Sequence, residues 1–131
     1  MINSCLTTEG RFAFLQGRIQ PGHVFKLALY TDKANLGEDT VCYTPINEVV
    51  GQGYAAIRLA NPVFARVGKL AVMNFPGELL WKNATISAAG CMIFDETLDN
   101  LAIAVGSFGS IISSTNDTFR LDPPENLVIF K

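Results

Sequence analysis

Residues 86–108, ISAAGCMIFDETLDNLAIAVGSF, restrict the fold more than any other stretch of the chain. They contain two apolar segments separated by a polar hinge at residues 95–100. Both segments keep apolar or small side chains at successive positions, whereas a strand with one face in water alternates apolar and polar side chains. The pattern therefore predicts a β-hairpin that must be covered on both faces.

Strand signals continue on either side of this hairpin, and one helix signal precedes it. We expect a short helix within residues 5–18, capped by Thr7 or Thr8, with Phe12, Leu15 and Ile19 on one side. Alternating patterns and turn residues predict further strands at residues 24–30, 54–66, 69–76, 79–81, 118–121 and 127–130, with 54–66 and 69–76 joined as a hairpin around Val67-Gly68. About eight strands without βαβ alternation predict an all-β fold, an antiparallel β-sandwich or jelly roll. We expect a single domain, residues 1–131, with an N-terminal arm at residues 1–22.

Two longer segments lack a clean strand pattern. Residues 31–50 carry turn formers with isolated apolar anchors at Leu36, Val41 and Tyr43, which predicts an ordered excursion across the surface. Residues 109–117 are expected to form an exposed loop. Strands 24–30 and 118–121 are expected to cover one face of the hairpin. No segment obviously covers the other face, and this deficit favours contacts with other subunits.

Composition narrows the classes of partner. Apolar residues make up 49% of the chain and charged residues only 17%, against about 25% charged in an average soluble domain. So little charge leaves apolar side chains on the surface, where partners can cover them. The formal net charge of −2 provides no basic surface, so we expect neither nucleic acid nor membrane as a partner.

The cysteines and the first residues bear on the compartment. Cys5, Cys42 and Cys91 are odd in number and lack the spacing of a zinc site, so we interpret them as small buried hydrophobes in a reducing environment. The first residues show no secretory pattern, and no window of the sequence is long and apolar enough to span a membrane. We expect the protein to be made and assembled in a cytoplasm.

No catalytic, cofactor-binding or metal-binding set is evident. His23 is the only histidine and follows a Pro-Gly pair, where an ordinary turn or surface histidine is the expected role. Asp95, Glu96 and Asp99 lie in the hairpin turn but lack the alternating oxygen ligands of a calcium loop. A hydrolase would require His23 and a turn carboxylate to converge. We therefore expect a protein that is not an enzyme and holds no cofactor.

Large apolar residues in segments with weak claims on the core are the candidates for partner contact. We predict a contact surface that includes Phe12, Phe14, Tyr30, Ile111 and Ile112.

The order of landmarks along the chain resembles a family of small structural proteins of tailed bacteriophage virions. The likeness covers roughly residues 23–130 and follows strand and turn motifs: FKLALYT at 25–31, ANLG at 34–37, YT at 43–44, NEV at 47–49, GQGY at 51–54, MNF at 73–75, WKNATI at 81–86, AGCMIF at 89–94, AIAV at 102–105 and FGS at 108–110. The chain departs from the family near its start, where EGRFAFLQGR replaces a longer helix.

This resemblance implies a β-rich structural component of a virion. The leading expectation is a capsid decoration or cement protein on the outer capsid surface, bound to the phage major capsid protein and to itself as a dimer or trimer. The alternative is a neck, tail or fibre-attachment component. Either protein would be assembled in the host bacterial cytoplasm and would act by binding, without turnover.

Overall fold

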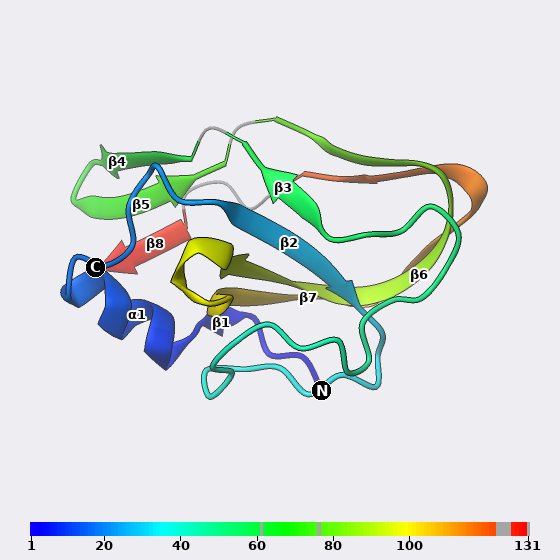
Figure 1. The fold of residues 1–131 in the computed structure, drawn as a ribbon, viewed down its shortest axis with the longest axis horizontal. Helices are drawn as coiled ribbons and strands as arrows, with labels where there is room; N and C mark the ends of the chain where they lie inside the picture. The colour runs from blue at the N-terminus through cyan, green and yellow to red at the C-terminus, as the bar shows by residue number, and fades with distance from the viewer. Residues whose placement is uncertain (61, 76, 123–126, 131) are drawn as a thin grey trace.

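The computed structural model describes residues 1–60, 62–75 and 77–122, together with the backbone of 127–130. Figure 1 shows these residues as strands, with one short helix at the lower left. The elements follow the order β1 (Cys5–Leu6), α1 (Thr8–Leu15), β2 (Phe25–Tyr30), β3 (Ile57–Leu59), β4 (Val63–Val67), β5 (Leu70–Asn74), β6 (Leu79–Asp95), the 3-10 helix η1 (Glu96–Leu98), β7 (Leu101–Leu121) and β8 (Leu127–Phe130).

Two antiparallel sheets contain all of these strands. One sheet has the order β1-β7-β6-β2-β3 and the other the order β4-β5-β8. The predicted fold class, mainly antiparallel β with one short N-terminal helix, is confirmed.

The predicted hairpin is present and is longer than expected. β6 and β7 pair from Asp95–Leu101 at the η1 end to Leu79–Leu121 at the far end, with four register shifts between them. The predicted loop at residues 109–117 is therefore wrong, because these residues continue β7. Gly109 and Asn116 have left-handed backbone conformations, and the pairing of β6 with β7 contains register shifts. The strand therefore contains turn-forming residues, and its sequence does not show the regular alternation of a strand.

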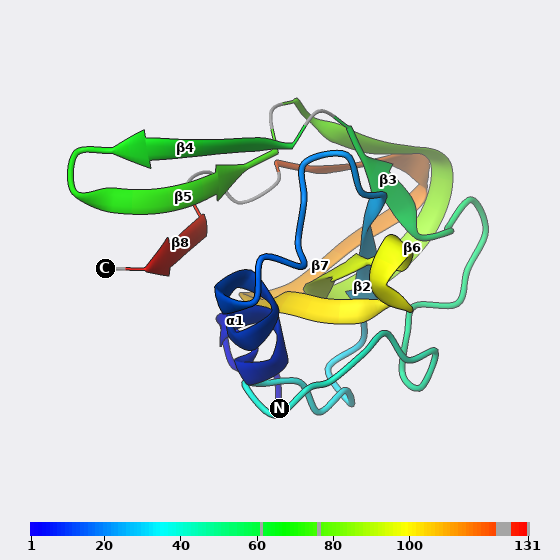
Figure 2. The ribbon, with the colours of Figure 1, turned by 60° about the vertical axis from the view of Figure 1, so that its left-hand side comes forward.

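The long hairpin curves around so that its two halves form part of two layers (Figures 1 and 2). The larger core lies between them: Trp81 and Phe119 of the far half belong to the same buried cluster as Ile93 and Ile103 of the near half. Trp81 lies in the core, and its indole N–H donates to the Ala55 carbonyl at 2.8 Å. The expected cover by residues 118–121 is confirmed by Phe119, but β2 pairs alongside β6 in the same sheet and does not cover it.

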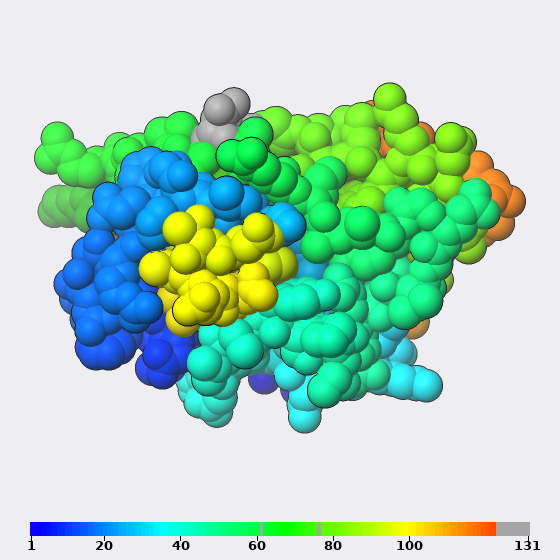
Figure 3. All heavy atoms as spheres, in the orientation of Figure 1, coloured from blue at the N-terminus to red at the C-terminus, as the bar shows by residue number. Residues whose placement is uncertain are grey.

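The other face of the hairpin is covered by the chain itself. A second buried cluster contains Met92 and Phe94 of β6 together with Ala34 and Leu36 of the excursion at residues 31–50. The Tyr43 ring stacks on Phe94 with ring centroids 4.7 Å apart. Figure 3 shows this excursion, coloured cyan to green, lying over the lower front of the molecule. The predicted lack of cover is therefore wrong, and it gives no support to assembly.

The excursion is ordered, as predicted, but not all of its expected anchors are buried. Leu36 is buried and Tyr43 is half-buried, whereas Val41 is exposed. The backbone joins the sheet through Val49, whose amide donates to the Leu29 carbonyl at 2.9 Å. Two of the three predicted anchors, Leu36 and Tyr43, therefore pack against the rest of the protein, and Val41 does not.

The predicted strand at 54–66 divides between the two sheets. β3 pairs with β2, whereas β4 pairs with β5 around a two-residue turn at Gly68-Lys69. The predicted hairpin is confirmed, with its turn one residue later than expected. In Figure 2 the β4–β5 pair extends to the left, away from the five-stranded sheet.

The short helix α1 packs through small residues. The Thr7 hydroxyl accepts a hydrogen bond from the Gly10 amide at 2.8 Å, which is the predicted N-cap. A Cβ atom built at Gly10 would lie 3.0 Å from the backbone of Ile103, so only glycine permits this approach to β7. Because the buried face is Gly10 and Ala13, the predicted face of Phe12 and Leu15 points to solvent instead.

Candidate interaction surfaces

His23 and Asp95 converge at the η1 end of the hairpin. The His23 Nδ1 atom lies 2.7 Å from the Asp95 Oδ2 atom, and the carboxylate is fully buried. The other carboxylate oxygen accepts from the Thr97 amide at 3.0 Å, which caps η1. His23 is thus a half-buried histidine at the end of a turn, paired with a carboxylate, which agrees with the predicted turn histidine but not with a fully exposed surface one. No signal in the sequence joins two residues that lie 72 positions apart.

This pair has the geometry of two members of a catalytic triad, because a carboxylate orients the imidazole. In the described residues, however, no serine, threonine or cysteine forms a hydrogen bond with His23. The neighbouring Thr97 hydroxyl accepts from the Val24 amide at 2.9 Å. His23, Asp95 and Thr97 therefore connect the hairpin turn to the start of β2, and their hydrogen bonds stabilise the fold.

A carboxylate and two phenols form a second polar cluster. Glu48 accepts a hydrogen bond from Tyr43 on one oxygen and from Tyr54 on the other. The Tyr54 hydroxyl also accepts from the Leu29 amide at 3.0 Å. Burial, followed by the hydrogen bond to Glu48, raises the pKa of Tyr43 to about 12 and raises that of Tyr54 as well. Protonated phenols at neutral pH hold the excursion against β2.

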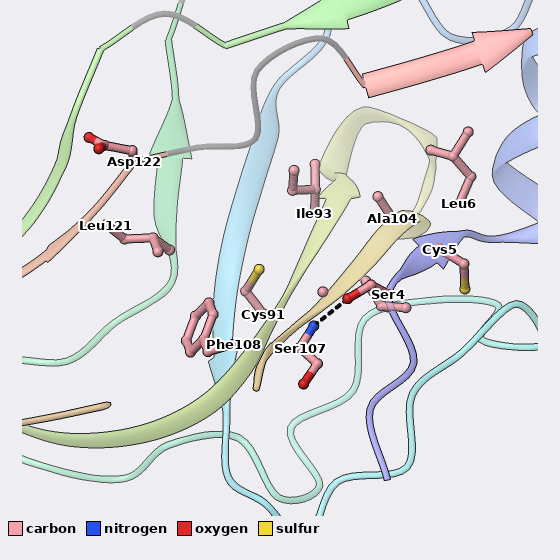
Figure 4. A pocket seen from close by; sticks show the side chains of 12 residues that line it. Ser4, Cys5, Leu6, Cys91, Ile93, Ala104, Ser107, Phe108, Leu121 and Asp122 are labelled. Carbon is pink, nitrogen blue, oxygen red and sulfur yellow. Dashed lines mark hydrogen bonds between the residues drawn. The ribbon is translucent and has the colours of Figure 1, made fainter. Parts of the chain in front are cut away.

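One cavity of about 440 Å³ opens beside β1 and β7 (Figure 4). Apolar side chains dominate its lining, and Cys5 and Cys91 contribute thiols. Burial raises the pKa of Cys91 to about 12, so this thiol is protonated and a poor nucleophile at neutral pH. In the described ranges no three histidine, cysteine or acidic side chains are grouped so as to hold a metal ion.

The cysteines differ from one another in exposure. Cys91 is buried, as predicted, but Cys5 is half-buried and Cys42 is exposed, so the prediction of three buried thiols is wrong for these two.

The first apolar surface lies on α1 and β4. Phe12 and Leu15 are 52% and 70% exposed, and Phe64 of β4 is also exposed. The Phe14 ring meets the Phe64 ring edge to face at 6.1 Å, which links the helix to β4. We call Phe12, Phe14, Leu15 and Phe64 the helix surface. It includes two of the residues predicted for partner contact, Phe12 and Phe14.

The second apolar surface lies on the far half of the hairpin. Val50 is 96% exposed and Ile111 56%, and both line a hollow of about 540 Å³ that also contains Asp32 and Lys33. Ile112 is exposed and pairs with Ala88 across the hairpin. We call Val50, Ile111 and Ile112 the hairpin surface. Ile111 and Ile112 were predicted for partner contact, and both lie where a partner can reach them.

Tyr30 is the exception among the predicted contact residues. Its side chain is fully buried in the smaller core, and its hydroxyl donates to the Thr44 carbonyl at 2.6 Å. Tyr30 therefore cannot form part of a contact surface. Tyr30 was predicted as a large apolar residue with a weak claim on the core, but the excursion at residues 31–50 covers it.

Comparisons with known proteins complete the description of these surfaces. In the part of the chain that the structure describes, no helix has the length and apolar character needed to cross a membrane. A scan against protein-family models, a search of curated proteins and a search of solved structures each found no match.

Proposed function

We propose that this protein is a structural component of a tailed bacteriophage virion, and specifically a capsid decoration or cement protein. It binds the phage major capsid protein at the outer surface of the head, as a homo-oligomer. Binding stabilises the head by mass action, because a protein that binds only the assembled lattice lowers the free energy of that lattice. No chemical step is involved.

The observation that carries this proposal is the pair of exposed apolar surfaces. The helix surface and the hairpin surface lie on different elements, so one molecule can contact two neighbouring subunits. Isolated apolar side chains are ordinary on protein surfaces, but clusters of large ones are typical of binding sites. The order of strand and turn motifs along residues 23–130, which resembles small virion proteins, supports the same proposal.

The polar clusters favour binding over catalysis. His23 and Asp95 fasten the hairpin turn, and Glu48 with its two tyrosines fastens the excursion. Each cluster satisfies its own polar atoms, and in the described residues no buried side-chain nitrogen or oxygen lacks a hydrogen-bond partner. The His23→Ala variant should therefore retain binding to capsids. If it abolished a lytic activity of the protein, the structural proposal would be wrong.

Stability of the particle tests the cement role. Virions that lack this protein should release their DNA at a lower temperature, or at a lower chelator concentration, than complete virions. Adding back the purified protein should restore the original value. Unchanged stability without the protein would contradict the cement role.

Single substitutions test the two surfaces. Ile111→Ser and Phe12→Ser should each weaken binding to capsids about 10- to 100-fold, which corresponds to about 1.5–3 kcal/mol for a buried large apolar side chain. Val41→Ser is the matched control, because Val41 is similarly exposed but lies outside both surfaces. All three variants should unfold at nearly the same denaturant concentration as the parent. Equal binding by all three would contradict the assignment of the surfaces.

A further inference from the structure

β4 is an edge strand in which a single charged side chain, Arg66, is the only one of the usual protective features. It lies at one end of the β4-β5-β8 sheet, and Val63, Phe64 and Val67 are exposed. Natural edge strands carry a lysine, a proline or a bulge that prevents pairing with another chain. The pairing of β4 with β5 has no register shift, and Arg66 is the only charged residue in β4.

The hairpin geometry identifies the backbone groups that β4 offers. Val67 and Leu70 flank a two-residue turn and therefore form a hydrogen-bonded pair, and such pairs alternate along an antiparallel ladder. The next hydrogen-bonded pair is Ala65 with Val72. The amides and carbonyls of Phe64 and Arg66 must then point away from β5. In the described part of the chain, no side chain accepts a hydrogen bond from either amide.

Only one symmetric register uses all of these groups. If a second β4 pairs antiparallel about a two-fold axis through Ala65, Phe64 lies opposite Arg66 of the other copy on both sides of the axis. Each such pair exchanges two N–H···O bonds, so four bonds form. A register centred on Arg66 sets two like charges opposite each other, and one centred on Phe64 sets Arg66 against Pro62, which has no amide hydrogen.

The side chains agree with the same register. Val63 lies opposite Val67 of the other copy, and Ala65 lies opposite Ala65, in the closely spaced pairs that bring side chains together. Phe64 lies beside Arg66, which permits a cation–π contact. We propose that β4 is a self-pairing edge that joins two copies of this chain into one continuous six-stranded sheet.

This inference specifies the homo-oligomer of the proposed function and can fail independently of it. Self-pairing is measured with the purified protein, whereas binding to capsids is measured with particles. Failure of self-pairing with capsid binding intact would overturn this inference alone.

Cysteine crosslinking tests the register. In a Cys42→Ser background, which removes the exposed native thiol, Ala65→Cys should form a disulfide-linked dimer on mild oxidation. Cα atoms in a closely spaced pair lie about 4.5 Å apart, within the range of a disulfide. Val63→Cys alone should not crosslink, because its two thiols lie about 13 Å apart in this register. An equal mixture of Val63→Cys and Val67→Cys should crosslink again.

Removal of one amide tests the backbone pairing. Arg66→Pro deletes the outward donor without loss of a β4–β5 bond, and Arg66→Ala is the matched control that keeps the amide. By analytical ultracentrifugation, Arg66→Pro should dimerise at least tenfold more weakly than Arg66→Ala. The two variants should have the same melting temperature at a protein concentration where both are monomeric. Equal dimerisation of the two variants, or an Ala65→Cys variant that crosslinks no faster than Val63→Cys, would overturn the proposal. If Arg66→Pro instead lost only its binding to capsids, the edge would accept a strand of another protein.

Discussion

β4 and the outer half of β7 are both strands with a free edge, but they differ in sequence, in backbone regularity and in the partners of their amides. Along residues 107–121, β7 combines serine, threonine and asparagine side chains with left-handed positions and register shifts. Several of its amides donate to side-chain oxygens: Ser107 to Ser4, Gly109 to Ser107, Asn116 to Thr85 and Thr118 to Asp117. In the part of the chain that the structure describes, β4 has no left-handed position, no register shift against β5 and no amide that donates to a side chain.

The difference indicates which edge is available to a partner. A bulged strand whose amides are occupied presents a poor template for a second strand, whereas a regular apolar strand presents a good one. We expect β7 to contribute side chains to binding, through the hairpin surface, and β4 to contribute backbone pairing. The predictions below change the devices that separate the two edges.

The largest effect is expected at the bend of the long hairpin. A Cβ atom added at Gly90 would lie 2.4 Å from the Gly106 carbonyl oxygen, beside a register shift in β6. Gly90→Ala should lower the free energy of unfolding by about 2–3 kcal/mol, measured by urea denaturation. Gly22→Ala is the control, because nothing lies within 4 Å of a Cβ there. Equal stability of the two variants would show that the bend does not require glycine.

A smaller effect is expected where a side chain occupies a β7 amide. Thr85→Val keeps the shape of the side chain but removes the oxygen that accepts from the Asn116 amide at 3.1 Å. The free energy of unfolding should fall by about 1 kcal/mol, and the Asn116 amide should exchange its hydrogen faster. Thr115→Val, at an exposed neighbour, should change neither quantity. An unchanged exchange rate at Asn116 would show that the Thr85 hydroxyl does not protect this amide.

The last effect is absent at neutral pH and appears only at alkaline pH; it concerns the Leu29 amide of β2, which donates a hydrogen bond to the Tyr54 hydroxyl. The Tyr43 phenol, which shares Glu48 with Tyr54, has a pKa of about 12 in the folded protein and near 10 in the unfolded chain. Between these values the unfolded chain loses a proton that the folded protein keeps. The contribution of Tyr43 to the free energy of unfolding should therefore be constant below pH 10 and be lost as the pH rises towards 12.

Tyr43→Phe provides the control for this titration. The variant should lose part of the slope above pH 10, and the remaining slope belongs to Tyr54, Tyr30, Cys91 and Cys5, whose pKa values are also raised by burial. Denaturation curves at several pH values measure both slopes. An identical slope in the variant would contradict the assignment to Tyr43.

Regular spacing of apolar and turn residues in the sequence predicted the fold. It did not predict which segments far apart in the sequence contact one another. The two-sided apolar character of β6 and β7, the N-cap at Thr7 and the hairpin at Gly68 were all visible because each depends on local spacing. The cover supplied by Ala34 and Leu36 was not, since two apolar residues in a turn-rich segment carry no period. The burial of Tyr30 follows from that cover and was missed for the same reason.

The candidate surfaces were partly predictable. Phe12, Ile111 and Ile112 were identified as apolar residues in segments with weak claims on the core, and each is exposed. Val50 was missed because it follows Val49 in a Val-Val pair, of which only Val49 is buried. The free edge of β4 could not be predicted, because strand order within a sheet depends on pairing between distant segments.

A density map of purified particles tests most directly whether this protein decorates the head. We expect many copies of this fold on the outer surface of the head, with the helix surface or the hairpin surface against the major capsid protein. A single ring of copies at the neck or tail would replace the decoration role with an adaptor role. The absence of the protein from the particle would contradict the account.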